Sequence, residues 1–147
     1  KGVFAYSTGH PKYPNLSDTK TTAILQYSDN LRCALSLNHC YQFGPDNQNA
    51  NVKIEGTDGV VLITLGSMLN YPNFEQDKFQ IKTGKTNWQE IKLEGNWFPD
   101  AFEGTMSNLQ RYIHKEDQVL ETSVEDTVNT MKLIDSLMKS KDNFYKI

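Results

Sequence analysis

The hydrophobic pattern of this chain changes period once, and that change restricts the folds it can adopt. Between residues 3 and 93, apolar side chains tend to alternate with polar ones, which is typical of β-strands with one buried face. From residue 98 onward they recur every three or four positions, as along one side of an α-helix. Strands that precede helices in this way favour an α+β fold over an alternating α/β fold.

The clearest strand pattern covers residues 31–43. A polar turn at residues 28–30 precedes it and predicts a hairpin with a strand at residues 21–27. The odd positions of the 31–43 strand are mostly apolar and should face a core, whereas the even positions should be wetter. The odd positions are Leu31, Cys33, Leu35, Leu37, His39, Tyr41 and Phe43, and the even ones are Arg32, Ala34, Ser36, Asn38, Cys40 and Gln42.

Five further strands are expected, and two helices follow them. The strands lie at residues 3–8, 51–55, 60–65, 77–82 and 88–93. The expected buried stripe of the first helix is Phe98, Phe102, Met106, Leu109 and Ile113. The second helix, capped by Ser123 and ending near Ser140, has the stripe Val124, Val128, Met131, Ile134 and Met138. We therefore predict a two-layer α+β fold, in which both helices pack on the odd face of the 31–43 strand in one mainly antiparallel open β-sheet.

Composition argues against nucleic-acid and membrane partners. The chain has 15 basic and 18 acidic residues and no basic block, so binding to a phosphate backbone is not expected. Its longest apolar run, residues 60–65, is far shorter than the ~20 residues of a membrane-spanning helix. Cys33 and Cys40 would lie about 23 Å apart in one strand and cannot pair there, and free thiols suit the cytoplasm. Because the first residue is Lys1 and a strand pattern begins almost at once, we expect a fragment of a longer protein, the alternative being a tag remnant or a processed N-terminus.

The motifs of catalysis and cofactor binding are absent from the chain. It contains no G-x-G-x-x-G dinucleotide motif and no G-x-x-x-x-G-K-[ST] phosphate loop. It also lacks H-E-x-x-H and C-x-x-C, so a dedicated metal site is not expected. No residue of the chain is therefore predicted to be catalytic, to bind a cofactor or to ligate a metal.

Four residues are candidates for contacts with a small ligand. His10 and Tyr13 lie in a loop with one glycine and two prolines, where ligand contacts concentrate, although a solvated loop also explains them. His39 lies near a strand end. It either contacts a ligand or lies in or at the edge of the core, with its ring nitrogen hydrogen-bonded within the protein. Trp97 stands at a helix entrance, where it pins the helix or stacks on a sugar while its N–H meets a hydroxyl.

Several segments together resemble the C-terminal domain of the glucose–fructose oxidoreductase and inositol dehydrogenase family, called Gfo/Idh/MocA. They are the strand at 18–27 leading into 31–39, the strand–turn–strand IEGTDGV at 54–60, WFPDAFEGTM at 97–106 and SVEDT at 123–127. Their order and spacing match that domain over nearly the whole chain.

The resemblance implies that residues 1–147 are a single C-terminal domain on the substrate side of a longer oxidoreductase. Such enzymes bind NAD or NADP in an N-terminal Rossmann domain, hold a sugar or polyol between the domains, and often form homo-oligomers through the open sheet face. The family's catalytic lysine stands in a Glu-Lys-Pro motif that this chain lacks, so the fragment alone should be inactive. The alternatives are a stand-alone small-ligand binding module and a structural oligomerisation domain.

Overall fold

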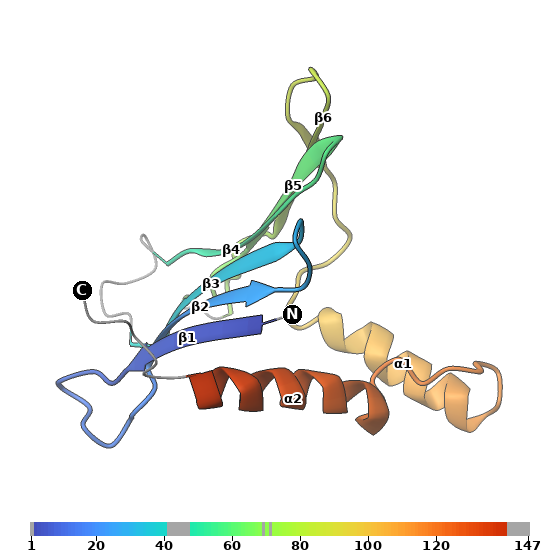
Figure 1. Ribbon diagram of the computed structural model, residues 1–147. Coiled ribbons are helices and arrows are strands. Elements are labelled where there is room, and N and C mark those ends of the chain that lie inside the picture. Colours follow the sequence, from blue (N-terminus) through green and yellow to red (C-terminus); the bar gives the residue numbers. More distant parts are fainter. Residues whose placement is uncertain (1, 41–47, 69, 71, 141–147) are drawn as a thin grey trace. The chain divides into compact units, whose positions relative to one another are not determined.

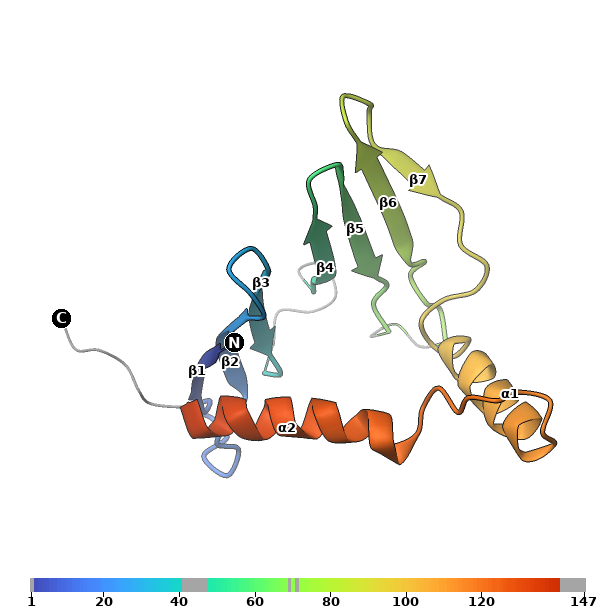
Figure 2. The ribbon, with the colours of Figure 1, turned by 45° about the vertical axis from the view of Figure 1, so that its right-hand side comes forward.

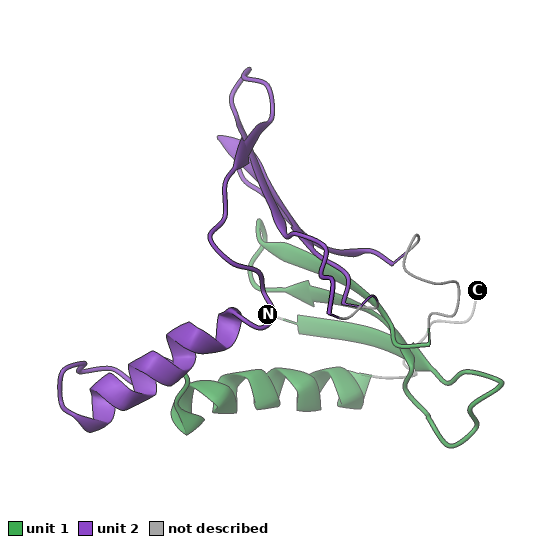
Figure 3. Cartoon of the chain, turned by 180° about the vertical axis from the view of Figure 1, so that it is seen from behind, with its two compact units in different colours: residues 1–42, 122–147 green, residues 43–121 purple. Residues whose placement is uncertain are grey.

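The computed structural model describes residues 2–40, 48–68, 70 and 72–140. The chain divides into two compact units, which are coloured separately in Figure 3. Unit 1 combines Lys1–Gln42 with Thr122–Ile147, and unit 2 is Phe43–Glu121.

Unit 1 contains a three-stranded antiparallel sheet and the last helix (Figure 1). Its strands follow the chain in the order β1 (Gly2–Thr8), β2 (Lys20–Gln26) and β3 (Arg32–Asn38). Helix α2 (Val124–Ser140) packs against β1. The strands predicted at 3–8 and 21–27 and the hairpin between 21–27 and 31–43 are confirmed.

The 31–43 strand is shorter than its alternating pattern predicts. β3 ends at Asn38, whose side-chain oxygen accepts a hydrogen bond from the backbone N–H of Cys40 at 3.1 Å. This local side-chain bond competes with the strand ladder and turns the chain. Residues 41–43 of the predicted strand lie outside the described part of the chain.

The core of unit 1 is small and lies on the predicted face. Ala5, Ala23 and Leu25 are buried, and Ala5 pairs with Ala23 across the ladder. On β3, Leu35 lies opposite Ala23 and is half-buried, while the strand's other residues are exposed. The odd face of β3 thus faces the core only weakly, because α2 packs against β1, the strand at the other edge of this sheet.

Unit 2 contains a second antiparallel sheet and the other helix (Figure 2). The strands are β4 (Ala50–Glu55), β5 (Gly59–Leu65), β6 (Lys78–Thr83) and β7 (Gln89–Ile91), again in chain order, and the helix is α1 (Ala101–Ile113). The predicted strands and the α+β class are confirmed, but the prediction of one sheet was wrong. The described strands form two open sheets, and α1 and α2 belong to different units.

The predicted buried stripes of both helices were also wrong. On α2, the stripe residues are 42–78% exposed, whereas Leu133 and Leu137 are half-buried. At about 100° per residue, these two leucines lie roughly opposite Val124, Met131 and Met138. α2 is therefore apolar on two sides, and periodicity alone does not select the side that packs. The predicted Ser123 cap is confirmed, since its Oγ accepts the Asp126 N–H at 3.2 Å.

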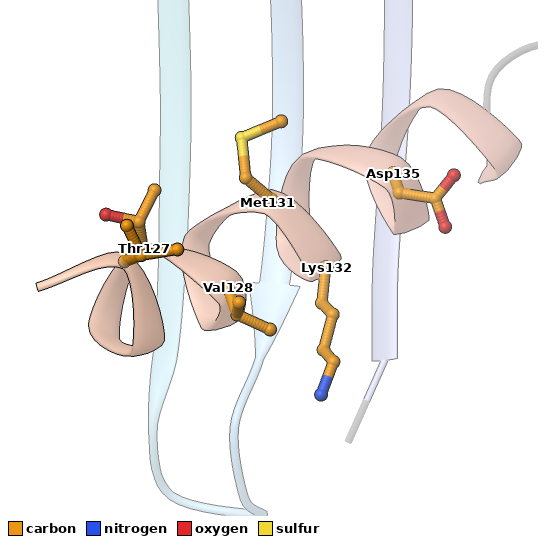
Figure 4. Close-up of a pocket in the computed structure, with 6 residues that line it drawn as sticks. Thr127, Val128, Met131, Lys132 and Asp135 are labelled. Carbon is orange, nitrogen blue, oxygen red and sulfur yellow. The ribbon is translucent and has the colours of Figure 1, made fainter.

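A shallow hollow runs along the exposed side of α2, and Figure 4 shows the side chains around it. Its volume is about 330 Å³, and all the residues that line it come from this one helix. Lys132 and Asp135 supply its charges. No described helix is long and apolar enough to cross a membrane.

The buried residue of α1 is polar. Asn108 is 3% exposed, whereas Met106 of the predicted stripe is 54% exposed. The Asn108 amide nitrogen donates to Asp117 Oδ2 at 2.9 Å and to the Val119 carbonyl at 3.0 Å. Its oxygen accepts the Glu121 N–H at 3.0 Å. Asn108 therefore fastens the segment that follows α1 back onto the helix.

We predict that Asn108→Ala lowers the free energy of unfolding by about 1–3 kcal/mol, because it removes three hydrogen bonds made by a buried side chain. Met106→Ala should change it by less than about 0.5 kcal/mol, since the side chain is mostly exposed. Urea titrations of the two variants measure the difference. A larger loss for Met106→Ala would show that this side of α1 is the packed one.

Candidate functional site

The four predicted ligand residues are divided between the two units. His10, Tyr13 and His39 belong to unit 1, and Trp97 belongs to unit 2. The rings of His10 and Tyr13 lie 5.3 Å apart between centroids, and the Tyr13 N–H donates to the His10 carbonyl at 2.9 Å. His10 Nδ1 also accepts the Lys12 N–H at 3.2 Å, which orients the imidazole within the loop.

His39 lies at the same end of the three-stranded sheet as this loop. Thr8 pairs with Lys20, and Lys20 pairs with Asn38, so the loop after β1 and the residue after β3 share one edge. The backbone N–H of His39 donates to the Thr19 carbonyl at 2.8 Å, and the side chain is exposed. Within the described residues, no three histidine, cysteine or acidic side chains come together to hold a metal ion.

Trp97 borders a pocket of about 410 Å³ within unit 2, which we call the Trp97 pocket. Its walls come from the segment before β4, the end of β5 and the segment before α1. The lining residues are neutral: Gln48, Ala50, Leu65, Gly66, Ser67, Met68 and Trp97. Ser67 is buried, and its hydroxyl donates to Gln48 Oε1 at 2.9 Å across the pocket wall.

Three hydrogen bonds among Gly66, Asp77 and Trp97 form a closed triangle that fixes this wall. Asp77 Oδ1 accepts the Gly66 N–H at 2.7 Å, and Asp77 Oδ2 accepts the backbone N–H of Trp97. The indole Nε1 of Trp97 donates to the Gly66 carbonyl at 3.1 Å. Because the indole N–H is engaged there, Trp97 presents its ring to the pocket, and not the N–H expected from the sequence to meet a ligand hydroxyl.

Gly66 is required by the close approach of a second segment. A Cβ at this position would lie 1.9 Å from the Glu75 carbonyl oxygen, which is an impossible contact. The same segments are joined beside it, since Glu75 Oε2 accepts the Ser67 N–H at 3.2 Å. The glycine therefore lets the residues before β6 pack directly on the end of β5.

A second glycine shapes the entrance to α1. Gly95 has φ +79°, and a Cβ there would meet the Asp100 carboxylate at 2.7 Å. Asp100 Oδ2 accepts the Asn96 N–H at 2.7 Å, and Asn96 Oδ1 accepts the Asp77 N–H at 3.1 Å. This chain of hydrogen bonds connects the start of α1 to the triangle at Trp97.

Aromatic contacts of Phe98 also hold the segment around Trp97. Phe98 is half-buried and meets Phe74 edge-on at 6.1 Å and Phe102 at 5.8 Å between centroids. Its ring also lies 5.9 Å from that of Trp97. Such pairs hold aromatic side chains in defined orientations. The described residues that line the pocket are uncharged, and one of them is an exposed indole.

The sequence predicts Trp97 as a candidate, and the structure places it at a pocket, but the sequence does not indicate the residues that hold it. Asp77 is predicted only as the beginning of a strand, and Gly66 and Asn96 are not among the candidates. Gly66 and Trp97 are 31 positions apart, so no short motif joins them. The sequence signal that could have indicated Gly66 and Asp77 is a glycine at the end of one apolar strand and an acid at the start of the next.

Comparison with known proteins identifies one solved structure with a similar fold. Seven antiparallel strands in two open sheets, followed by two helices, define the class of the described chain as α+β. The fold is similar to a solved structure described as "putative oxidoreductase from Thermotoga maritima", with a TM-score of 0.69. The two share 17% identity, and the match covers 96% of this chain and 38% of that one. No family model matches the chain, and no curated protein matches its sequence.

We predict that Gly66→Ala destabilises the protein by about 1–3 kcal/mol, because the added methyl group displaces the segment at Glu75. Gly104→Ala is the matched control. Position 104 lies within α1 with nothing within 4 Å of a Cβ, so alanine there should add about 0.5–1 kcal/mol of stability. Denaturant midpoints measure both changes, and a neutral Gly66→Ala would contradict the close approach.

Proposed function

We propose that this chain is the substrate-side, C-terminal domain of a longer NAD(P)-dependent oxidoreductase that acts on a sugar, a polyol or a related hydroxy compound. The observation that carries the proposal is the fold match, which spans 96% of this chain and 38% of the Thermotoga maritima structure. The chain thus corresponds to a part of that protein. The Gfo/Idh/MocA family is the proposed family.

The positions of the family-like segments support the proposal. Residues 54–60 form the β4–β5 hairpin, in which the Gly56 N–H donates to the Gly59 carbonyl at 2.9 Å. Residues 97–106 contribute Trp97 to the pocket and begin α1. Residues 123–127 form the capped start of α2. Each segment thus begins or connects an element of the fold.

The proposed division of labour follows from the chemistry of hydride transfer. The nicotinamide carries the hydride, and the protein binds and orients the substrate. We assign NAD or NADP to an N-terminal Rossmann domain, because this chain has no dinucleotide motif. This chain would then supply substrate contacts through Trp97 and through His10, Tyr13 and His39 at the end of the first sheet. The proposed location is the cytoplasm, where the free thiols of Cys33 and Cys40 would remain reduced.

The proposed partner is a second copy of the chain, bound to one face of the β4–β7 sheet. The ladder places nine apolar side chains on this face, with Val52, Ile54 and Ile91 from 44% to 58% exposed. The other six are Ala50, Val61, Ile63, Leu65, Phe79 and Ile81. The opposite face carries the charges, including Lys53 and Glu55, which pair at 2.8 Å.

The pattern of this apolar face suits self-association. Strand spacing and rise give it sides of roughly 15 and 17 Å, a patch of a few hundred Å². A face without charges can meet its own copy across a two-fold axis, because no like charges are brought together. The even face of β3, which includes Ser36, is the other candidate, because the sequence predicts it to be wetter than the odd face. The apolar face of the β4–β7 sheet is favoured because its exposed side chains are apolar.

An activity assay of the full-length protein tests the proposed function. We expect purified full-length protein to reduce NAD or NADP, or to oxidise the reduced form, with at least one member of a panel of sugars, polyols and their keto forms. The 147-residue chain alone should neither bind nor turn over the cofactor, as calorimetry can show. Full-length protein that does not bind nicotinamide, or a chain alone that does, would contradict the proposal.

Sedimentation of charge variants tests the proposed partner. Ile54→Glu should shift the dimer towards monomer by tenfold or more in dissociation constant, about 1.4 kcal/mol, because it places like charges on both copies. Ser36→Glu on β3 is the control and should leave the assembly unchanged. The opposite result would locate the contact on the three-stranded sheet.

A further inference from the structure

We infer that the Trp97 pocket binds one face of an uncharged, hydroxylated ring and discriminates against phosphorylated or carboxylated forms of the same ring. The sugar or polyol class rests on the proposed function, whereas the selection for a neutral ligand rests on the pocket itself. The inference narrows the substrate class by charge and identifies residues that would carry the choice.

The charges around the pocket oppose an anion. Among the described residues, those that line the pocket include no cation, so they would give a phosphate or carboxylate no counter-charge. Two carboxylates border the wall, since Asp77 accepts the N–H groups of Gly66 and Trp97, and Glu75 accepts that of Ser67. These backbone N–H groups already donate to the two carboxylates, so they are not free to bind an anion. The negative charge of the carboxylates would also repel it.

The Trp97 ring is held ready for stacking. Its backbone N–H is bonded to Asp77 and its indole N–H to Gly66, so the residue is held once through its backbone and once through its side chain. The residue is nevertheless 40% exposed. A ring fixed before binding loses little conformational entropy when it stacks on the C–H face of a ligand.

Gln48 supplies the polar contact. Its side-chain oxygen accepts the Ser67 hydroxyl at 2.9 Å, which leaves the amide N–H₂ group as the donating end. Within the described residues this amide nitrogen has no partner, and the side chain is exposed at the pocket edge. A hydroxyl of the stacked ring would accept from it. Asp77 is then a positioning residue, which acts on the ligand through Trp97.

The two tryptophans allow a direct test in the 147-residue chain. Trp88 is 45% exposed and does not line the pocket, so Trp88→Phe leaves Trp97 as the reporting fluorophore. We expect myo-inositol or methyl glucoside to change Trp97 emission saturably. Glucose 6-phosphate and glucuronate should reach half-saturation only at a concentration at least about tenfold higher. The reason is that their charge finds no counter-charge among the described residues that line the pocket. Equal or tighter binding of the anions would overturn the inference, as would a panel without any saturable change.

Calorimetry of variants identifies the residues responsible. Trp97→Ala should weaken binding of the neutral ring about tenfold, and Gln48→Ala about threefold to tenfold. The matched control Trp88→Ala should bind as the unaltered chain does. Asp77→Asn should weaken binding and also change Trp97 emission before any ligand is added, which a residue without a positioning role would not do. Equal affinities for Trp97→Ala and Trp88→Ala would contradict the assignment.

The full-length enzyme separates this inference from the proposed function. If nicotinamide-dependent turnover of a polyol is present but kcat/KM is the same in Trp97→Ala, the pocket assignment fails while the function stands. If the chain binds the neutral ring through Trp97 but the full-length protein has no nicotinamide-dependent activity, the function fails while the pocket stands.

Discussion

The site depends on the two hydrogen bonds that the Asp77 carboxylate accepts from backbone N–H groups. The carboxylate accepts these hydrogen bonds from the backbone N–H groups of Gly66, directly after β5, and of Trp97, before α1. Asp77 itself directly precedes β6. Charge-assisted hydrogen bonds to backbone donors are directional and stronger than neutral ones. They matter here because no large side chain of the described residues is fully buried, so apolar packing alone does not fix these segments.

The elements of the fold were predictable because their signals are local. Alternation, turn residues and the Ser123 cap identified the strands and both helices to within a few residues. The division into two sheets was not predictable, since the pattern of residues 31–43 continues past the Asn38 side-chain bond that ends β3. The packed side of α2 was missed because Leu133 and Leu137 compete with a second apolar side, and that choice depends on contacts distant in sequence.

The sequence predicts Trp97 as a ligand contact from its position at a helix entrance, and the structure places it at a pocket. The hydrogen bonds that hold Trp97 were not predicted. Gly66 and Asp77 could be recognised only after folding, because the triangle joins positions 11, 20 and 31 residues apart. His10, Tyr13 and His39 follow from loop and strand-end positions. The role of these three residues and of Trp97 in ligand binding stays a prediction. The close contact at Gly66 explains why this position excludes a side chain, although its sequence context is an ordinary strand end.

The exchange rates of the two indole N–H protons, measured by NMR, test most directly whether Trp97 is a fixed wall. The Trp97 proton is bonded to the Gly66 carbonyl, whereas the Trp88 indole has no partner among the described residues. We expect the Trp97 proton to exchange at least about tenfold more slowly than that of Trp88, because its hydrogen bond must open first. Equal rates would show that the indole is not held and would contradict the account of the site.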